Sequence, residues 1–284
     1  MTSAPHRAAA LAVDTLCGMV GRRQTVRVAR FALNRARLDL PNSPDCNGEH
    51  ALQRWVLAAT PPDRPCTVFD VGANVGAWSL ALLRTSGELG RPEPPRIHAF
   101  EPTSATFETL RGRLPAGVRA NRLALSDDAG ERRMFIVAPG SGRNSLQPVD
   151  DAPVTATEGV ATDTVDGYVR ANGIERIDLL KIDTEGHDFT VLLGARGCLA
   201  ERRIALAQFE YNHRWVYARR FLKDVFDLVR PYGYRIGKLT PRGVESYPGW
   251  DADLETFVES NYVLGTEAAL AVLPQVSWWK SGRR

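Results

Sequence analysis

The stretch from 68 to 78, with the sequence VFDVGANVGAW, restricts the fold of this 284-residue chain more than any other segment. A run of β-branched and aromatic residues ends there in small residues, and apolar residues at helical spacing follow up to Leu83. This pattern predicts a strand, a tight turn and a helix. Gly72 and Gly76 leave the backbone open to a ligand at the positive end of the helix, and Asn74 tolerates a left-handed conformation. The turn is typical of a site for a nucleotide-like ligand.

A second short apolar run, from 96 to 100, ends in Glu101 and Pro102. In doubly wound sheets an acidic residue at the tip of the second strand accepts hydrogen bonds from both hydroxyls of a ribose. Asp70 lies just before the glycine turn, and its carboxylate suits a cationic sulfonium ligand better than a pyrophosphate, which it would repel. These two acidic residues favour S-adenosylmethionine over a nicotinamide dinucleotide.

Ionisable residues gather at the end of the apolar run from 177 to 182. Open α/β sheets bind ligands at the edge where parallel strands end. Charges at this density need a ligand, a metal or a partner that compensates them. The same argument makes Glu210, after the run from 204 to 209, a second candidate. The candidates at the first run are Lys181, Asp183, Glu185, His187 and Asp188.

Small polar residues follow the third predicted strand, over 118–123. Adenine commonly lies at the end of that strand in this architecture, so Leu125, Ser126 and Asp127 are candidate adenine contacts. A surface turn is an equally good interpretation of these residues. The polar loop over 140–145 follows an added strand and would suit a position over the site.

The order of predicted elements is that of a doubly wound α/β fold, with a Rossmann-like, mostly parallel sheet and an N-terminal helical extension. We expect an extension over 1–48, a nucleotide-binding domain over 49–265 and a tail over 266–284, anchored by Trp278 and Trp279. Predicted helices cover 49–59, 103–114, 164–171, 189–199 and 219–229, an added strand covers 131–137, and closing strands cover 234–238 and 261–264.

The composition is that of an ordinary globular protein, with 44% hydrophobic and 24% charged residues. A net charge of +3 is too small to indicate a nucleic-acid partner. The four cysteines contain no C-x-x-C pair, which argues against structural zinc and a disulfide framework. No apolar run approaches the ~20 residues of a membrane-spanning helix, and the N-terminus lacks the order of a secretory signal. We therefore expect a cytoplasmic protein.

Arginines alternate with apolar residues between 11 and 37, which predicts one or two basic amphipathic helices. One interpretation is peripheral contact with the anionic inner face of a membrane, or capture of an acidic or lipid-linked acceptor. The other is a helical cap on the nucleotide-binding domain with its arginines in water. No motif indicates an oligomeric state.

With these motifs in place, the chain resembles the FkbM-like methyltransferases, a family of class I S-adenosylmethionine-dependent enzymes with a seven-stranded sheet. The most specific match is the run LKIDTEGH from 180 to 187. Further matches lie at 69–76, 99–102 and 124–127, and the resemblance covers about residues 49–265. The family often has an acidic residue where this chain has His187, which leaves the identity of the catalytic base open.

The resemblance implies O-methylation of a hydroxyl on a sugar, a glycolipid or a polyketide-type natural product. A neutral hydroxyl attacks poorly unless a base removes its proton. We expect Asp183 or His187 to be that base, with Lys181, Glu185 and Glu210 orienting the hydroxyl or tuning the base. The expected cofactor contacts are Asp70, Gly72, Ala73, Asn74, Gly76, Glu101, Pro102, Leu125, Ser126, Asp127 and Asp183.

Three alternatives accompany this prediction. Asp183, Glu185 and Glu210 offer hard oxygen ligands of the type that magnesium prefers, although no tight ligand motif is present. A nicotinamide-dependent oxidoreductase would use the same sheet, but it normally has a Gly-x-Gly-x-x-Gly turn. A non-catalytic nucleotide-binding scaffold would have no need for the ionisable cluster. We expect residues 1–50, the loop around Asn144 and the segment 240–255 to select the acceptor.

Overall fold

The computed structural model describes residues 3–39, 43–148, 150 and 153–277. The chain forms two compact units, residues 1–42 and 43–284, and each is described by itself. Trp278 and Trp279, the predicted anchors of the tail, lie outside the described residues.

The first unit contains two helices, α1 (Ala4–Val20) and α2 (Arg22–Ala36), separated by Gly21. The φ angle of Gly21 is 86°, a conformation that favours glycine and ends the first helix. Of the residues in these two helices, Thr25 alone is buried. No helix in the described part of the chain is long and apolar enough to cross a membrane. The large apolar side chains exposed here are Leu11, Val13, Leu16, Met19, Val20, Val26, Val28, Phe31 and Leu33.

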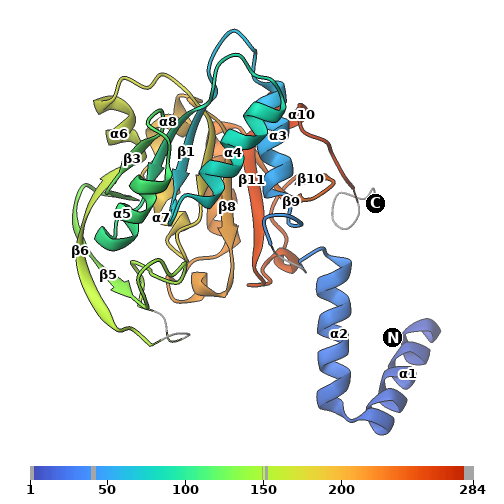
Figure 1. Cartoon of the computed structure of the whole chain (residues 1–284). Coiled ribbons are helices and arrows are strands. Elements are labelled where there is room, and N and C mark those ends of the chain that lie inside the picture. The colour runs from blue at the N-terminus through green and yellow to red at the C-terminus, as the bar shows by residue number, and fades with distance from the viewer. Residues whose placement is uncertain (1–2, 40–42, 149, 151–152, 278–284) are drawn as a thin grey trace. The chain divides into compact units, whose positions relative to one another are not determined.

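A central sheet of eight strands organises the second unit, in the order β10-β9-β11-β8-β7-β1-β2-β3 (Figure 1). The pairs from β8 to β3 are parallel, while β11 runs antiparallel to both of its neighbours. The strand order reverses between β1 and β7, which creates a crevice at their carboxyl ends. The strands are β1 (Thr67–Val71), β2 (Arg96–Phe100), β3 (Arg119–Asn121), β7 (Ile177–Ile182), β8 (Ile204–Tyr211), β9 (Tyr234–Thr240), β10 (Gly243–Tyr247) and β11 (Ser260–Thr266).

This architecture confirms the predicted doubly wound α/β class, with eight strands where seven were expected. The additional strand is β10, which lies in the segment 240–255, where no strand was predicted. It pairs antiparallel with β9 after a tight turn at Gly243. That turn needs a glycine, since φ is 153° and a Cβ atom would lie 2.5 Å from the carbonyl oxygen of Pro274.

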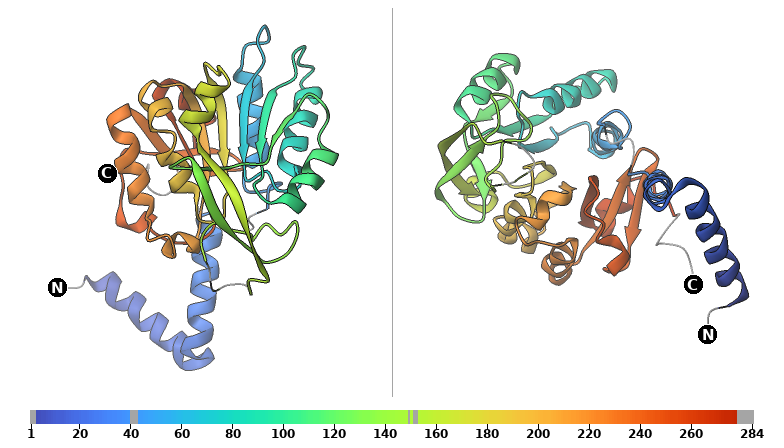
Figure 2. Two further views of the ribbon diagram at one scale, coloured as in Figure 1. Left: turned by 90° about the vertical axis from the view of Figure 1, so that its left-hand side faces the viewer. Right: turned by 90° about the horizontal axis from the view of Figure 1, so that it is seen from below.

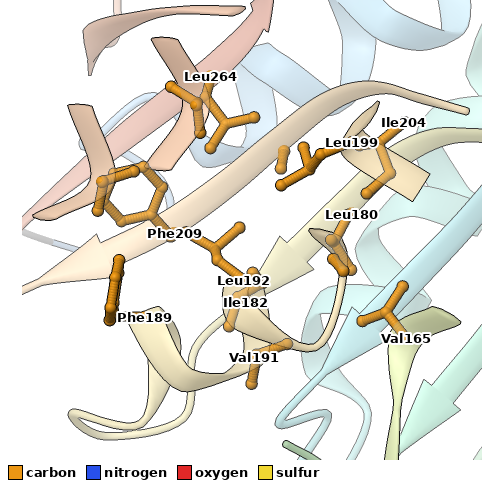
Figure 3. Packing of buried hydrophobic residues seen from close by; sticks show 14 of the residues in the cluster. Val165, Leu180, Ile182, Phe189, Val191, Leu192, Leu199, Ile204, Phe209 and Leu264 are labelled. Atoms are coloured by element: carbon orange, nitrogen blue, oxygen red, sulfur yellow. The ribbon is translucent and has the colours of Figure 1, made fainter. Parts of the chain in front are cut away.

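Helices cover both faces of the sheet and enclose two apolar cores (Figure 2). Alternate side chains of a strand enter opposite cores, so Leu179 lies in one core and Leu180 in the other. Figure 3 shows the core that contains Leu180, where side chains from β7, β8 and β11 meet those of α6, α7 and α8. One face carries α3 (Glu49–Ala59), α4 (Ala77–Glu88), α5 (Ser104–Arg113) and α10 (Glu267–Ala271), and the other carries α6 (Val165–Ala171), α7 (Asp188–Leu193), α8 (Arg196–Ala200) and α9 (Leu222–Val229).

The single helix predicted over 189–199 is two short helices, α7 and α8, because the chain bends at Gly194. A Cβ atom at Gly194 would lie 1.9 Å from the carbonyl oxygen of Ser126. Glycine therefore allows the end of α7 to approach β4 (Ala124–Ser126) closely. The helix predicted to begin at 219 begins at Leu222, since Arg219 has a φ of 53°.

A small second sheet lies beside the central one, with the order β4-β6-β5. Its β5 (Gly130–Ile136) agrees with the strand predicted over 131–137. Its longest strand, β6 (Ala156–Thr164), was not predicted, because its sequence ATEGVATDT has few apolar residues. The loop over 137–147, which connects to β5, is positioned by this sheet. The strands β5 and β6 are the green and yellow-green arrows in Figure 2.

We expect Gly194→Ala to lower the free energy of unfolding by about 2 kcal/mol or more, since the new methyl group must displace backbone. Gly117→Ala is the matched control, because nothing lies within 4 Å of a Cβ atom there. That variant should stay within about 0.5 kcal/mol of the wild type. Urea denaturation followed by circular dichroism measures both values. Equal stabilities of the two variants would contradict the close approach.

Candidate active site

A cavity of about 660 Å³, including its open mouth, lies at the carboxyl ends of β1, β2 and β7. The turn after β1, the tip of β2, the small sheet and the loop after β7 form its walls. Its apolar lining consists of Val71, Phe100, Pro102, Leu123, Ala124, Leu125, Met134 and Leu146. Its ionisable lining consists of Glu101, Asp183, Glu185 and His187.

The turn after β1 has the left-handed conformations that its sequence predicts. The φ angles of Gly72, Asn74 and Gly76 are 76°, 48° and 81°. The glycines also permit close packing, since a Cβ atom at Gly72 would lie 1.9 Å from the carbonyl oxygen of Asp183. At Gly76 it would lie 2.9 Å from the side chain of Leu110 on α5. Both missing side chains therefore make room for other parts of the protein.

The backbone amides of this turn are engaged within the protein. The N–H groups of Gly72 and Ala73 donate to the carbonyl oxygen of Phe100, at 3.1 and 2.9 Å. The N–H group of Asn74 donates to the carboxylate of Glu101. These three hydrogen bonds fasten the turn after β1 to the end of β2. The side-chain oxygen of Asn74, which is buried without a hydrogen-bond partner, remains available.

Glu101 lines the cavity at the tip of β2. Its carboxylate accepts hydrogen bonds from the N–H and the hydroxyl of Thr103, at 3.0 and 2.5 Å. Burial raises its pKa, and the bonds from Thr103 and Asn74 lower it, with a net shift upward. These bonds fix the carboxylate next to Pro102, where the sequence predicts the ribose. The Glu101 carboxylate therefore lies in the cavity at a position from which it can contact the ribose.

Asp70 and Lys181 form a buried ion pair behind the cavity. Their side chains are 0% and 3% exposed, and the Lys181 Nζ lies 3.0 Å from the Asp70 Oδ1. The hydroxyl of Ser79 donates to the other carboxylate oxygen at 2.7 Å. The charge of Asp70 is thus neutralised within the protein, and Asp70 does not line the cavity. The charge of Asp70 therefore does not select a cationic ligand, contrary to the expectation from the sequence.

Lys181 also connects the turn after β1 to the loop after β7. Its Nζ donates to the carbonyl oxygen of Gly72 at 3.1 Å and lies 3.5 Å from the carboxylate of Asp183. Burial lowers the pKa of Lys181, but the charges of Asp70, Asp183 and Glu49 raise it by more than burial lowers it. The net shift of the pKa is therefore upward. The ammonium group therefore stays charged and holds Asp183 at the edge of the cavity.

Asp183 and Glu185 are carboxylates on the loop after β7, with side chains 43% and 23% exposed. Glu185 has a φ of 56° and pairs with the buried guanidinium of Arg214 at 2.8 Å. Burial and the charge of Asp183 raise the pKa of Glu185 to about 8, although Arg214 lowers it. The hydroxyl of Ser145 donates to the backbone carbonyl of Glu185 at 3.0 Å, which ties the 137–147 loop to this edge.

His187 is 1% exposed, and its Nε2 lies 3.1 Å from the hydroxyl of Ser126. Burial lowers its pKa to about 4, so the imidazole is neutral at pH 7. Ser126 is fully buried, and Asp127 pairs with Arg132 at 2.7 Å. Of the three predicted adenine contacts, Leu125 alone lines the cavity.

Glu210 does not line the cavity. Its carboxylate accepts a hydrogen bond from the Asn212 amide at 2.6 Å, and burial followed by the charges of Asp183 and Glu185 raises its pKa. Glu185 is engaged with Arg214. In the described part of the chain, no group of three or more His, Cys, Asp or Glu side chains is placed to hold a metal ion. The predicted magnesium ligands therefore do not converge there.

Sequence reasoning missed several residues of the site. Met134 and Leu146 line the cavity from the small sheet and its loop, and their sequence surroundings carry no motif. Ser141, Gly142 and Asn144 also line it, which confirms the expected position of the 140–145 loop. Strand pairing in the small sheet, rather than any local pattern, brings these residues to the site.

The lining of the cavity suits a cationic nucleoside. Among the described residues that line it there is no Lys or Arg, whereas Glu101, Asp183 and Glu185 are acidic. A pyrophosphate would find no positive side chain here, while a sulfonium would be attracted. The apolar wall around Leu125 and Met134 offers a surface for adenine. The residues present therefore fit S-adenosylmethionine.

The sequence model of the methyltransferase FkbM domain matches residues 70–236, which include the turn after β1, Glu101 and the loop after β7. The chain belongs to the FkbM methyltransferase family. The cofactor of this FkbM domain is S-adenosylmethionine, which the lining of the cavity fits.

Two known proteins are similar to this FkbM chain. The methyltransferase sdnD of Sordaria araneosa is 28% identical over 165 residues, which cover 47% of this chain and 61% of that protein. The hexuronic acid methyltransferase AglP of Haloferax volcanii is 25% identical over 158 residues, which cover 55% of this chain and 59% of that protein. The chain thus spans about three fifths of each relative.

A solved S-adenosylmethionine-dependent methyltransferase from Agrobacterium tumefaciens is also similar, with 10% identity and a TM-score of 0.39. The match covers 76% of this chain and 60% of that one.

We expect the contribution of Glu185 to cofactor affinity to rise with pH, because its carboxyl ionises with a pKa of about 8. Below that value the group is neutral and attracts the sulfonium weakly, whereas above it the charge is present. The affinity of Glu185→Gln for S-adenosylmethionine should be near the wild-type value at pH 6.5 and about tenfold weaker at pH 9. Calorimetric titration at both pH values measures the ratio of the wild-type affinity to that of the variant. The same ratio at pH 6.5 and pH 9 would contradict the prediction.

Proposed function

We propose that the protein is an S-adenosylmethionine-dependent O-methyltransferase that acts on a hydroxyl of a sugar, a glycolipid or a polyketide-type natural product. The observation that carries this proposal is the position of Asp183, a partly exposed carboxylate at the rim of the cofactor cavity, held by a buried lysine. Membership in the FkbM family and the similarity to a hexuronic acid methyltransferase support it. We assign the domain to 49–265, the extension to 1–48 and the tail to 266–284.

Asp183 is the general base of the proposed reaction. S-adenosylmethionine supplies a methyl group on a sulfonium, and the departing thioether needs no proton. Asp183 accepts the proton of the acceptor hydroxyl while the hydroxyl oxygen forms a bond to the methyl carbon. Lys181 holds the carboxylate in place at 3.5 Å and stabilises its charge before the proton is taken up. Glu210 on β8 interacts electrostatically with Asp183, and burial together with that charge raises the pKa of Glu210.

His187 has a different role in this proposal. It is 1% exposed, and its ring is bound to Ser126, so a solvent-borne acceptor does not reach it. We propose that His187 fixes the β4 segment, so that Leu125 packs against adenine. Glu101 binds the ribose hydroxyls, and Asn74 binds the cofactor through its unpartnered amide oxygen. A nicotinamide-dependent oxidoreductase is less well supported, since the lining described above has no cation for a pyrophosphate.

We expect Asp183→Asn to reduce turnover at least about a hundredfold, since the amide cannot accept the proton. Affinity for S-adenosylhomocysteine, which has no sulfonium charge, should change little, because the amide keeps the size of the side chain. Transfer of labelled methyl groups to a panel of hydroxylated sugars measures turnover, and calorimetry measures affinity. Asp128→Asn, at an exposed residue outside the cavity, is the control. Unchanged turnover in Asp183→Asn would remove Asp183 from the role of base.

We propose that the first unit binds peripherally to an anionic membrane surface. Residues 3–39 contain seven arginines and two aspartates, and α2 exposes Val28 and Phe31 to 61% and 60%. A basic helix with exposed apolar side chains lies in the interface of an anionic bilayer, where both features contribute to binding. This surface would bring the domain to a lipid-linked acceptor.

The protein should sediment with vesicles of phosphatidylglycerol and not with vesicles of phosphatidylcholine. The double variant Arg27→Glu/Arg30→Glu should bind at least about tenfold more weakly, since each positive charge contributes about 1 kcal/mol near the surface. Arg111→Glu/Arg113→Glu, a matched change on α5, should leave binding as it is. Equal binding to both vesicles, or to neither, would contradict a membrane role.

A further inference from the structure

A second cavity opens on the other side of the turn after β1. It has a volume of about 930 Å³, including its open mouth, and lies between the segment 44–50 and the first turns of α4. Gly72, Asn74 and Asp183 line both cavities, so they form the wall between them. The other lining residues of the second cavity are Pro44, Asp45, Glu49, His50, Ala73, Val75, Ala77, Trp78, Ala81, Arg84 and Lys181.

Several of the polar side chains that line this cavity are already bonded to other residues, so they form its wall. Lys181 is paired with Asp70. The Glu49 carboxylate accepts hydrogen bonds from the amides of Asn47 and Asn261, at 2.6 and 3.1 Å. The ring of His50 lies 3.2 Å from the carboxylate of Asp45. These contacts give the cavity a defined shape that does not depend on a ligand.

One polar group of the lining lacks a partner among the described residues. The indole N–H of Trp78 is buried without a hydrogen bond, and Trp78 is 8% exposed. A buried polar atom without a partner is costly, so such atoms indicate a place where a ligand bonds. The indole also offers an apolar face of the kind on which the C–H groups of a sugar ring pack.

Arg84 supplies a positive charge at this cavity. It is exposed, and among the described residues no carboxylate forms an ion pair with it. Arg84 follows the first residue of α4 by seven positions, which places it about 10 Å along the helix from the turn. A guanidinium binds a carboxylate or a phosphate through paired hydrogen bonds. The cavity thus has a carboxylate base at one wall and an anion-binding side chain farther along α4.

We propose that the second cavity binds the methyl acceptor, with the reacting hydroxyl at Asp183 and an anionic group of the acceptor, a carboxylate or a phosphate, on Arg84. This inference rests on the proposed methyltransferase function and names the substrate class of the same site. Asp183 is suited to the reaction because it borders the cofactor on one side and the acceptor on the other.

The test measures binding of small probes to the full-length protein saturated with S-adenosylhomocysteine. The probes are methyl β-D-glucuronide, glucose 6-phosphate and the neutral methyl β-D-glucoside, titrated by ligand-observed NMR. The variants are Arg84→Gln, which removes the charge, and Arg84→Lys, which keeps it. Arg113→Gln on α5 is the control, because Arg113 lines neither cavity.

At least one anionic probe should bind about tenfold more tightly than the glucoside, and Arg84→Gln should abolish that difference. Arg84→Lys should restore part of it, and Arg113→Gln should leave it intact. The stronger of the two anionic probes identifies the carboxylate or the phosphate as the preferred group. Equal binding of all probes, binding of none, or an unchanged preference in Arg84→Gln would overturn the proposal.

Failure of this inference is distinct from failure of the proposed function. Loss of S-adenosylhomocysteine binding by the wild-type protein would remove the methyltransferase proposal itself. Tight binding of S-adenosylhomocysteine with no preference for an anionic probe would remove only the role of Arg84 and the second cavity.

Discussion

The buried pair of Lys181 and Asp70 is the interaction on which the site depends. Placing two charges in the interior is unfavourable unless each is compensated, and removal of one partner from such a pair commonly costs about 3–5 kcal/mol. Here Ser79 and the carbonyl oxygen of Gly72 supply the additional hydrogen bonds. Lys181 on β7 is the register partner of Asp70 on β1, at the point where the strand order reverses. One ammonium group therefore fixes both the glycine turn and the loop that carries Asp183.

This arrangement separates two functions of acidic residues. Asp70 is neutralised and structural, whereas Glu101, Asp183 and Glu185 line the cavity and give it a negative field. The preference for a sulfonium cofactor thus comes from the tips of β2 and β7 rather than from the residue before the glycine turn. Burial, followed by the charge of Asp183, raises the pKa of Glu185 in this cavity.

Local patterns predicted the parts of this protein that depend on neighbouring residues. The left-handed conformation of Asn74, the helix at 49–59 and the strand that ends at Phe100 all follow from short-range sequence signals. Lys181 as a partner of Asp70 did not follow, because that contact depends on the register between two strands more than a hundred residues apart. The bend at Gly194 escaped prediction for the same reason, since only its packing on Ser126 explains it.

The sequence predicted where the candidate site lies, but not which side chains enter it. The cluster from Lys181 to Asp188 marks the correct edge of the sheet. Which of its side chains reach the cavity depends on the direction in which each one points and on how deeply it is buried. Glu210 and Asp188 turn to hydrogen bonds within the protein, and Asp188 is fully buried with a pKa that burial raises to about 7. The second cavity was not predictable, because Arg84 and His50 come to line one cavity only when α3 and α4 pack together.

The most direct test of this account is a crystal structure of the protein with S-adenosylhomocysteine and methyl β-D-glucuronide. The account predicts the ribose at Glu101, the thioether sulfur facing Asp183, and the glucuronide in the cavity beside Trp78 with its carboxylate on Arg84. A nucleoside bound elsewhere, or a sulfur atom directed away from Asp183, would contradict the central role of the wall between the two cavities.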